Sequence, residues 1–377
     1  MNEAIKISEY DLKNISEEEI KNSIKRIRCE HKSKFDISKD LLIKACIINS
    51  QPRNKILITA HHLVIDGVSW KVIIQDFYRI LKQILSSEEI DLPPKTNSYL
   101  SWARMLSNYK PKELQIVDYW KNILACKNKY YEEAKITLKQ KENISRELYL
   151  NEEETKKLID IANKTYNTNL FDLIVVATVK VIEKLQNSRY IIFELEGHGR
   201  YDSFSDIDIS RTVGWFTIIY PFMIKKIPEQ LSELIVEVKE ELRKIPNNGF
   251  DYGILKYLKH EFSVSDNNLV RLNYLGEIDD LDNNLFSVNY DAVDNVDPRN
   301  KMDSLMDINC YLKDNQLHIS FSGIRNLEKD KILDFVELYH KSLVNIIDLC
   351  GKSEQIHFTP SDFSTIDLSM DELDSLF

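Results

Sequence analysis

Two adjacent histidines, His61 and His62, stand where an apolar run of the chain ends. The surrounding segment reads KILITAHHLVIDGVSW, with an Asp-Gly pair four residues after the histidines. Successive side chains of an extended strand point to opposite sides, so one ring can face a cavity while the other braces the backbone. An imidazole titrates near neutral pH and can transfer protons, and Asp66-Gly67 predicts a tight turn that returns the chain beside the rings.

A second candidate is the segment ELEGHGR, which follows a strand-like run. In an extended chain Glu194 and Glu196 lie on the same face. One interpretation is a carboxylate in a cleft whose approach is kept open by Gly197 and Gly199. Burial would raise its pKa towards the operating pH, as a general base requires. The alternative is a polar strand exit with ordinary turn glycines.

Composition limits the class of protein. A chain of 377 residues that is 43% hydrophobic and 29% charged is typical of a soluble globular protein, and its length favours two lobes over one core. The net charge of −10 argues against nucleic acid as the main partner. No stretch has the pattern of a membrane span or a signal peptide. The five cysteines are scattered without a metal-ligand spacing, so we expect a reduced, cytoplasmic protein without a structural metal.

Hydrophobic periodicity predicts interspersed strands and helices, which indicates an α+β fold occurring twice. A capping box at Ser16–Glu19 opens a helix with a stripe of isoleucines. The other predicted helices are 70–85, 99–107, 113–126, 152–166, 170–185, 228–245 and 328–349. The predicted strands are 41–48, 55–60, 146–150, 190–196, 215–224 and 270–275, with a hairpin over 307–322. The polar segment Lys127–Glu142 is expected to be the hinge between lobes.

Taken together, several segments resemble one known family. HHLVIDG resembles the His-His-x-x-x-Asp-Gly signature of the condensation superfamily of nonribosomal peptide synthetases. The following Ser-Trp, and EGHGR further on, resemble its epimerization branch. The same branch is matched by RTVGWFT with a later Tyr-Pro, by PNNGFDYG and by NYLG. Each segment is short, but their order and spacing along 35–363 match as a set.

This resemblance implies two chloramphenicol-acetyltransferase-like α/β sandwich lobes in a V-shaped pseudo-dimer, with a tunnel between them. It implies an isomerase that inverts the α-carbon of an aminoacyl or peptidyl thioester in nonribosomal peptide synthesis. The substrate would be presented on the 4'-phosphopantetheine arm of a carrier protein, and the chain itself would bind no cofactor. The expected partners are therefore a carrier domain and neighbouring synthetase modules.

The resemblance also implies roles for single residues. His62 and Glu196 are the expected acid and base on opposite sides of the α-carbon, since removal and return of a proton need a group on each side. His61 is expected to be structural, and Asp66 to hold the loop by pairing with an arginine. Gly67 would let the arm pass close to the backbone.

The remaining candidates support these groups or line the tunnel. A donor near the thioester oxygen would stabilise the enolate-like intermediate, and it could be protonated His62 or a backbone N–H after the histidines. Weaker donor candidates and the expected wall residues complete the set: Tyr220 and Asn273 as donors, Trp215 and Tyr274 as walls, and His198 and Arg200 as supports.

The expected organisation is an N-terminal lobe over 1–142, a C-terminal lobe over 143–357, and an acidic linker or docking tail over 358–377. The family begins with a further strand and helix bearing a Pro-Ile-Gln-type motif, which is not found in Met1–Lys34. We therefore expect a first lobe that is shortened at its start.

Three other functions stay open at this point. A condensation domain that joins two carrier-bound substrates would share the histidine motif but gives no reason for EGHGR. A non-catalytic recruitment module of the same superfamily would usually lose the histidines, which are intact here. A simple acyltransferase would use the same histidine as a base towards a hydroxyl or amine. The residues do not identify the amino acid, the choice between aminoacyl and peptidyl substrates, or which group removes the L-proton.

Overall fold

The computed structural model describes residues 5–377 except 34, 111–113, 135–144, 186–189, 202–206, 263–269, 279–284, 289–303, 324–328, 354, 364–371 and 373–377. The chain divides into two compact units. Unit 1 holds the residues up to Arg104 and the described part of Phe204–Phe216. Unit 2 holds the described parts of Met105–Ser203, Thr217–Val288 and Arg299–Phe377.

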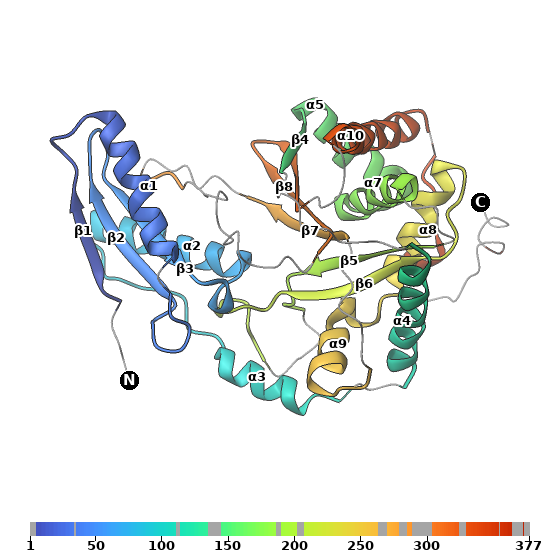
Figure 1. Ribbon diagram of the computed structural model, residues 1–377, viewed down its shortest axis with the longest axis horizontal. Coiled ribbons are helices and arrows are strands. Elements are labelled where there is room, and N and C mark those ends of the chain that lie inside the picture. Colours follow the sequence, from blue (N-terminus) through green and yellow to red (C-terminus); the bar gives the residue numbers. More distant parts are fainter. Residues whose placement is uncertain are drawn as a thin grey trace. The chain divides into compact units, whose positions relative to one another are not determined.

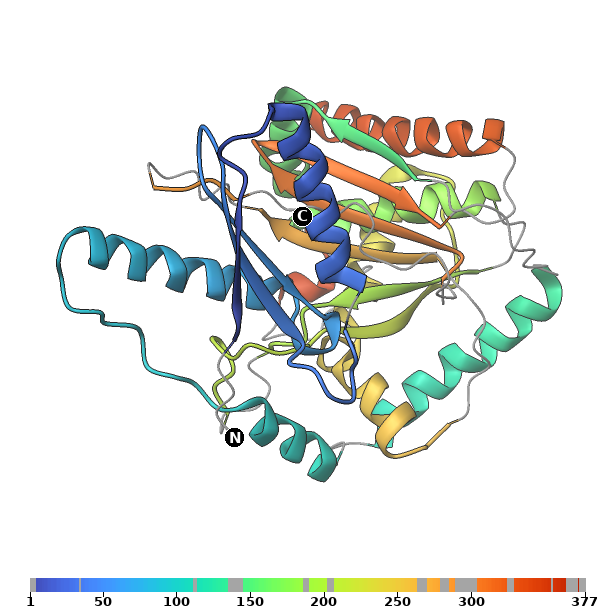
Figure 2. The ribbon, with the colours of Figure 1, turned by 60° about the vertical axis from the view of Figure 1, so that its left-hand side comes forward.

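Unit 1 is built on a three-stranded sheet in the order β1-β2-β3. Strand β1 (Ile7–Asp11) runs parallel to β2 (Ile43–Asn49), and β2 pairs with the antiparallel β3 (Lys55–Ala60). Helix α1 (Glu17–Ser33) lies beside this sheet (Figure 2). The core between them includes Ile27 of α1 and Cys46 and Ile48 of β2. The predicted capping box is confirmed, because Ser16 and Glu19 bond each other's backbone N–H reciprocally at 2.9 and 3.3 Å.

After β3 come the short helix η1 (His62–Val64), helix α2 (Gly67–Leu85) and helix α3 (Tyr99–Asn108), in which unit 1 ends. A segment from much later in the sequence, 207–216, also belongs to unit 1. It lies along the loop before α3, where Asn97 and Asp208 exchange backbone and side-chain hydrogen bonds of 2.8 and 2.9 Å. Residues far apart in sequence therefore build the same compact unit.

Unit 2 contains a six-stranded mixed sheet in the order β4-β9-β8-β7-β5-β6. Its strands are β4 (Arg146–Leu150), β5 (Ile191–Gly197), β6 (Ile218–Ile224), β7 (Val270–Glu277), β8 (Met306–Lys313) and β9 (Gln316–Ser322). Strands β5, β7 and β8 are parallel neighbours, while β6, β9 and β4 pair antiparallel at the flanks.

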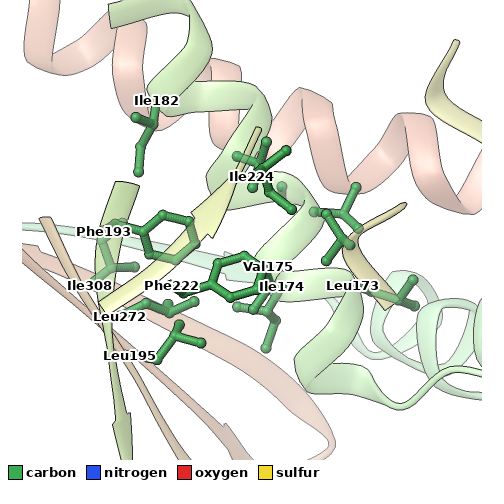
Figure 3. Close-up of a cluster of buried hydrophobic side chains, with 14 of the residues drawn as sticks. Leu173, Ile174, Val175, Ile182, Phe193, Leu195, Phe222, Ile224, Leu272 and Ile308 are labelled. Carbon is green, nitrogen blue, oxygen red and sulfur yellow. The ribbon is translucent and has the colours of Figure 1, made fainter. Parts of the chain in front are cut away.

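Helices cover one face of this sheet (Figure 1). They are α7 (Leu170–Leu185), α8 (Leu231–Arg243) and α10 (Lys329–Gly351). Leu173, Ile174 and Val175 of α7 pack against buried strand residues such as Phe193 and Phe222 (Figure 3). α7 is apolar almost all round, so it lies in the middle of the core, as its sequence predicts.

The remaining elements of unit 2 are short or lie outside that layer. They are α4 (Leu114–Ala134), α5 (Glu152–Lys157), η2 (Leu158–Ala162), α6 (Asn163–Tyr166), η3 (Pro246–Gly249), α9 (Phe250–Gly253), η4 (Ile254–Leu258) and η5 (Pro360–Asp362). The last of these anchors the end of the described chain. Asp362 accepts a hydrogen bond of 2.6 Å from Lys239, whose side chain is 1% exposed.

The α+β prediction is confirmed, with two separate sheets among the described residues. Strands β3 and β4 have the predicted bounds, and so has α7. Other bounds differ from the prediction. Helix α4 continues to Ala134 instead of ending at 126; 135–144 lies outside the described residues, and the expected hinge over Lys127–Glu142 stays a prediction. Strand β6 begins at Ile218 rather than Trp215, because Trp215 belongs to unit 1.

Strand β1 has no counterpart among the sequence predictions. The compact units are defined by packing, so the lobe boundaries at 142 and 357 stay predictions. Of the predicted tail, residues 358–363 pack on unit 2 through η5, and most of the rest lies outside the described residues. None of the helices in the described part of the chain is both long and apolar enough to cross a membrane.

Candidate functional site

The two histidines occupy different environments at the end of β3. The N–H of His61 donates to the carbonyl of Leu42 at 2.8 Å, which continues the β2–β3 pairing by one residue. Its Nδ1 accepts the N–H of Leu63 at 3.2 Å and thereby caps η1. His62 is the first residue of η1 and is exposed. His61 is therefore tied to the backbone on both sides, while His62 presents its ring to the surroundings.

Asp66 fixes the start of α2 directly after this turn. Its Oδ1 accepts the N–H of Ser69 at 2.7 Å, the usual bond of a helix N-cap, and the residue is only 4% exposed. Its Oδ2 accepts the N–H of Phe216 at 3.1 Å. These two contacts are with backbone amides, and the expected pairing of Asp66 with an arginine stays a prediction. Arg211, from the RTVGWFT segment, pairs with Asp76 of α2.

Three side chains hold three consecutive residues of the later segment, and we call this arrangement the clasp. Ser69 donates to the carbonyl of Gly214 at 3.0 Å and accepts its N–H at 3.1 Å. The hydroxyl of Tyr99 donates to the carbonyl of Trp215 at 2.9 Å. Asp66 accepts the N–H of Phe216, as described above. The backbone of Gly214–Phe216 is thus held from the two helices α2 and α3.

The clasp explains why a glycine stands at position 214. A Cβ there would lie 2.3 Å from a ring carbon of Tyr99, so no larger residue fits. Burial, with a smaller contribution from Asp66, raises the pKa of the Tyr99 phenol, which favours the protonated form that donates to Trp215. Ser69 and Tyr99 were not among the predicted site residues. The Ser-Trp that follows Asp-Gly was the only signal for Ser69.

The clasp leaves the side chain of Trp215 beside the exposed histidine. The indole and imidazole ring centroids are 5.6 Å apart, and Trp215 is 38% exposed. The sequence placed Trp215 near the site as a wall residue, although 153 positions separate it from His62. The first residue of α2 is also accessible: an ideal Cβ on Gly67 would meet no atom within 4 Å. One side of the His62 ring therefore carries an aromatic wall, and the turn beside it has free space.

The acidic segment lies on β5 in unit 2, where the two glutamates have different partners. Both point to the face opposite α7, as their spacing predicts. Glu194 pairs with Arg271 at 3.0 Å and with Lys127 at 3.8 Å, and the side chain of Lys127 is only 3% exposed. Two cationic side chains thus form ion pairs with Glu194.

Glu196 has an amide neighbour on the next strand. β5 and β7 are parallel with Glu196 opposite Asn273, and β7 and β8 are parallel with Asn273 opposite Asn309. Ser320 of β9 follows in the same row. We call these four residues the polar row; all four are partly exposed. Asn273 was among the predicted site residues, but Asn309 was not. The only sequence signal for Asn309 was its position in the predicted hairpin.

Two predicted site residues lie on the other face of the sheet. Tyr220 is opposite Leu195 on β6 and is buried against Trp120, so it does not share a face with Glu196. Tyr274 is opposite Cys310 and stacks on Phe171 of α7. Neither side chain therefore lies on the sheet face of Glu196, and the donor role of Tyr220 and the wall role of Tyr274 stay predictions. Burial raises the pKa of Tyr274 to about 12.

Local contacts and backbone conformation also explain the glycines of EGHGR, which the sequence suggested keep the approach to a carboxylate open. A Cβ on Gly197 would lie 2.6 Å from the hydroxyl of Tyr201, so this glycine accommodates an internal contact. Gly199 has a φ of +66°, which favours glycine. The Nδ1 of His198 accepts the N–H of Arg200 at 3.0 Å, and its ring contacts Tyr201 at 4.5 Å. These two contacts of His198 lie within the turn.

The PNNGFDYG segment forms an unusual turn in unit 2. Asn247, Asn248 and Gly249 have φ values of +44°, +52° and +83°. A Cβ on Gly249 would lie 2.1 Å from the ring of Tyr220. The buried Asp251 then accepts a hydrogen bond of 2.6 Å from Asn247, and burial raises the pKa of its carboxyl. This segment therefore supports the core under β6 and carries no side chain of the polar row.

The described residues contain no cluster of three or more metal-ligating side chains. Two groups able to transfer protons stand out instead: the His62 imidazole against an indole, and the Glu196 carboxylate beside an amide.

Known proteins are similar to this chain in sequence. The Condensation domain family matches residues 1–369. The chain is 33% identical to bacitracin synthase 2 of Bacillus licheniformis over 377 residues, covering 97% of this chain and 14% of that protein. It is 31% identical to gramicidin S synthase 1 of Brevibacillus brevis over 380 residues, covering 93% of this chain and 34% of that protein. The chain thus spans a minor part of these relatives.

A solved structure is also similar. The epimerization domain from the third module of tyrocidine synthetase B superposes with a TM-score of 0.77 and is 26% identical, covering 93% of this chain and 80% of that chain. The family match extends over nearly the whole chain and includes both the histidine turn and the polar row. The chain therefore belongs to the condensation-domain family of nonribosomal peptide synthetases.

Proposed function

We propose that this domain inverts the α-carbon of an aminoacyl or peptidyl thioester carried on the phosphopantetheine arm of a carrier protein. His62 and Glu196 are the two proton-transfer groups. The proposal makes the carrier domain and the neighbouring synthetase modules the partners of this chain. It is supported by the similarity to a solved epimerization domain and by relatives that are peptide synthases.

The chemistry requires two groups that act on opposite sides of one carbon. Removing the α-proton beside a thioester carbonyl gives an enolate-like intermediate, and returning a proton to the other face inverts the centre. Each positioned acid or base contributes about 10²–10⁴-fold to the rate. A hydrogen-bond donor at the thioester oxygen stabilises the developing charge. Protonated His62 is the candidate for this donor.

One observation carries the choice of epimerization over peptide-bond formation. Glu196 lies on the polar face of β5 next to Asn273, whereas Glu194 is held by Lys127 and Arg271. Bond formation between two carrier-bound substrates needs one base towards the attacking amine. A second carboxylate, placed on a sheet face beside an amide, has a role in a two-group proton transfer.

The test uses a carrier domain loaded with an L-aminoacyl group in D₂O. Wild type is expected to introduce deuterium at the α-carbon and to produce the D-epimer. His62→Ala and Glu196→Gln are expected to lose at least about 10²-fold in the formation of the D-epimer. Glu147→Gln is the matched control, because Glu147 lies on the same sheet face opposite Ser320 but at the edge strand β4.

Two outcomes would contradict the proposal. If both variants kept full α-deuterium exchange while folding like wild type, His62 and Glu196 would not be the proton-transfer groups. If wild type joined two loaded carriers without exchange at the α-carbon, the domain would be a condensation domain instead.

A further inference from the structure

The polar row holds two side-chain amides for which the described structure gives no internal partner. Asn273 and Asn309 face each other across the parallel pair β7–β8, and both are partly exposed. Neither side chain takes part in a hydrogen bond within the described part of the chain, whereas the adjacent charged row is paired through Glu194 and Arg271. Partly buried amides without an internal partner are available to a ligand.

The chemistry of these two side chains defines what they can bind. Each asparagine offers N–H donors and a carbonyl acceptor. Neighbouring strands lie about 4.8 Å apart, so Asn273 and Asn309 form a pair of donor–acceptor groups with that spacing. A secondary amide has one N–H and one C=O on opposite edges, and two such side chains can satisfy both. An ion would be a poor fit, because neither asparagine carries a charge.

Their position relative to Glu196 restricts which amide fits. Asn273 lies one strand from Glu196 and Asn309 lies two strands away, or about 5 and 10 Å between Cα atoms. A chain that crosses the strands with its reacting carbon at Glu196 therefore meets an amide-binding pair within the next few bonds. In an extended arm the thiol-proximal amide is about 6–7 Å from the α-carbon.

We propose that Asn273 and Asn309 bind a secondary amide of the carrier-tethered chain and thereby align its α-carbon with Glu196. This inference rests on the proposed function. The amide has two sources: the thiol-proximal amide of the phosphopantetheine arm, or the peptide bond of a peptidyl substrate. Asn309 is the more informative residue of the two, because it is farther from the carboxylate and its replacement leaves the surroundings of Glu196 in place.

The experiment measures D-epimer formation by wild type and Asn309→Leu on three loaded carriers. The first carries an L-aminoacyl group on the natural arm, and the second carries its N-acetylated form. The third carries the aminoacyl group on an arm whose thiol-proximal amide is replaced by an ester, which removes the N–H. Ser322→Ala is the control, because Ser322 lies on the same face of β9 but in the row of Asp307.

If the arm amide is bound, Asn309→Leu raises KM roughly tenfold on the natural arm, as expected for one lost hydrogen bond at the upper end of the usual range. With the ester arm the KM of wild type rises by a similar factor, and the KM of Asn309→Leu rises no further. If the peptide bond is bound, the variant is impaired only on the N-acetylated substrate. Ser322→Ala behaves like wild type on all three.

Equal kinetics of wild type and Asn309→Leu on all three substrates would overturn the inference. A second result would also overturn it: the increases in KM caused by Asn309→Leu and by the ester arm are fully additive, and the variant shows no selective effect on the N-acetylated substrate. Glu196→Gln separates this result from the proposed function. Loss of epimerization in Glu196→Gln with no effect of Asn309→Leu removes the amide site alone, whereas unchanged activity in Glu196→Gln removes the proposed function.

Discussion

The clasp can be tested by removing a single hydroxyl, in Ser69→Ala. Ser69 is fully buried, and its hydroxyl makes two hydrogen bonds to the buried Gly214, one to the carbonyl and one from the N–H. Alanine adds no clash but leaves both backbone groups without this partner. Each unsatisfied buried group costs about 1–2 kcal/mol, in the lower half of the usual range, so we expect unit 1 to lose about 2–4 kcal/mol.

Two measurements test this loss of stability. Thermal unfolding is expected to begin at a lower temperature in Ser69→Ala than in wild type. Amide hydrogen exchange, resolved by mass spectrometry, is expected to speed up about 30- to 1000-fold at 214–216, since local opening becomes easier by the same free energy. Ser98→Ala is the matched control. Ser98 is an exposed serine of the same unit and accepts a single backbone N–H, from Ser101, at 3.1 Å, so its loss costs about 1 kcal/mol.

The comparison of the two serines decides the result. If Ser69→Ala destabilised the protein no more than Ser98→Ala and left exchange at 214–216 unchanged, the clasp would not hold the later segment. Epimerization adds a functional measure. Since the clasp fixes Trp215 beside His62, Ser69→Ala is expected to lower kcat as well as stability, whereas Ser98→Ala changes kcat little.

Three further changes have outcomes set by the contacts. Glu194→Gln removes the charge that pairs with the nearly buried Lys127 and should lower the free energy of unfolding by about 2–3 kcal/mol; a smaller loss in chemical denaturation than for the Glu147→Gln control would contradict the ion pair. Burial raises the pKa of Asp362, but bonds from Lys239, the backbone and Asn167 outweigh it and lower the pKa overall. Its contribution is therefore present above about pH 4 and lost as the pH falls through the lower folded pKa, so the melting-temperature gap between wild type and Asp362→Asn should close in acid and would stay constant if the pair were absent. Gly67→Ala meets no atom within 4 Å and should keep wild-type stability while raising KM for the loaded carrier; unchanged kinetics would show that the arm does not approach this residue.

Local patterns predicted many elements of this fold well. The bounds of β3 follow from an apolar run between a Pro-containing turn and the histidines, and α7 follows from a long apolar helix pattern. The carboxylate pair of β5 followed from alternation alone, because Glu194 and Glu196 are two residues apart. These predictions depend only on neighbours in sequence.

The errors have a different physical origin. Trp215 was assigned to a strand that continues to Ile224, yet its backbone is held by Tyr99, 116 residues earlier. No local pattern contains such a contact. In contrast, the relative faces of Asn273 and Tyr274 could be read from the sequence. Asn273 and Tyr274 are consecutive in one strand, so they point to opposite faces and only one of them can lie beside Glu196.

The segments that resemble the epimerization branch are coupled in pairs by contact. Gly214 has no side chain because Tyr99 lies where a Cβ would be, and its backbone is bonded by Ser69 of the histidine motif. Gly249 of PNNGFDYG likewise makes room for the Tyr220 ring of the Tyr-Pro segment. A change in one member of such a pair leaves a clash or an unsatisfied backbone group in the other, so the members have to change together.

This coupling separates scaffold from chemistry within the same motifs. Once the clasped and packed residues are set aside, the accessible motif side chains include His62 with Trp215 in unit 1, and Glu196 with Asn273 in unit 2. Substitutions at the packed positions should therefore act first on stability, and substitutions at these accessible positions should act first on turnover. A Glu196→Gln variant that unfolded readily, or a Ser69→Ala variant of wild-type stability and reduced turnover, would contradict this division.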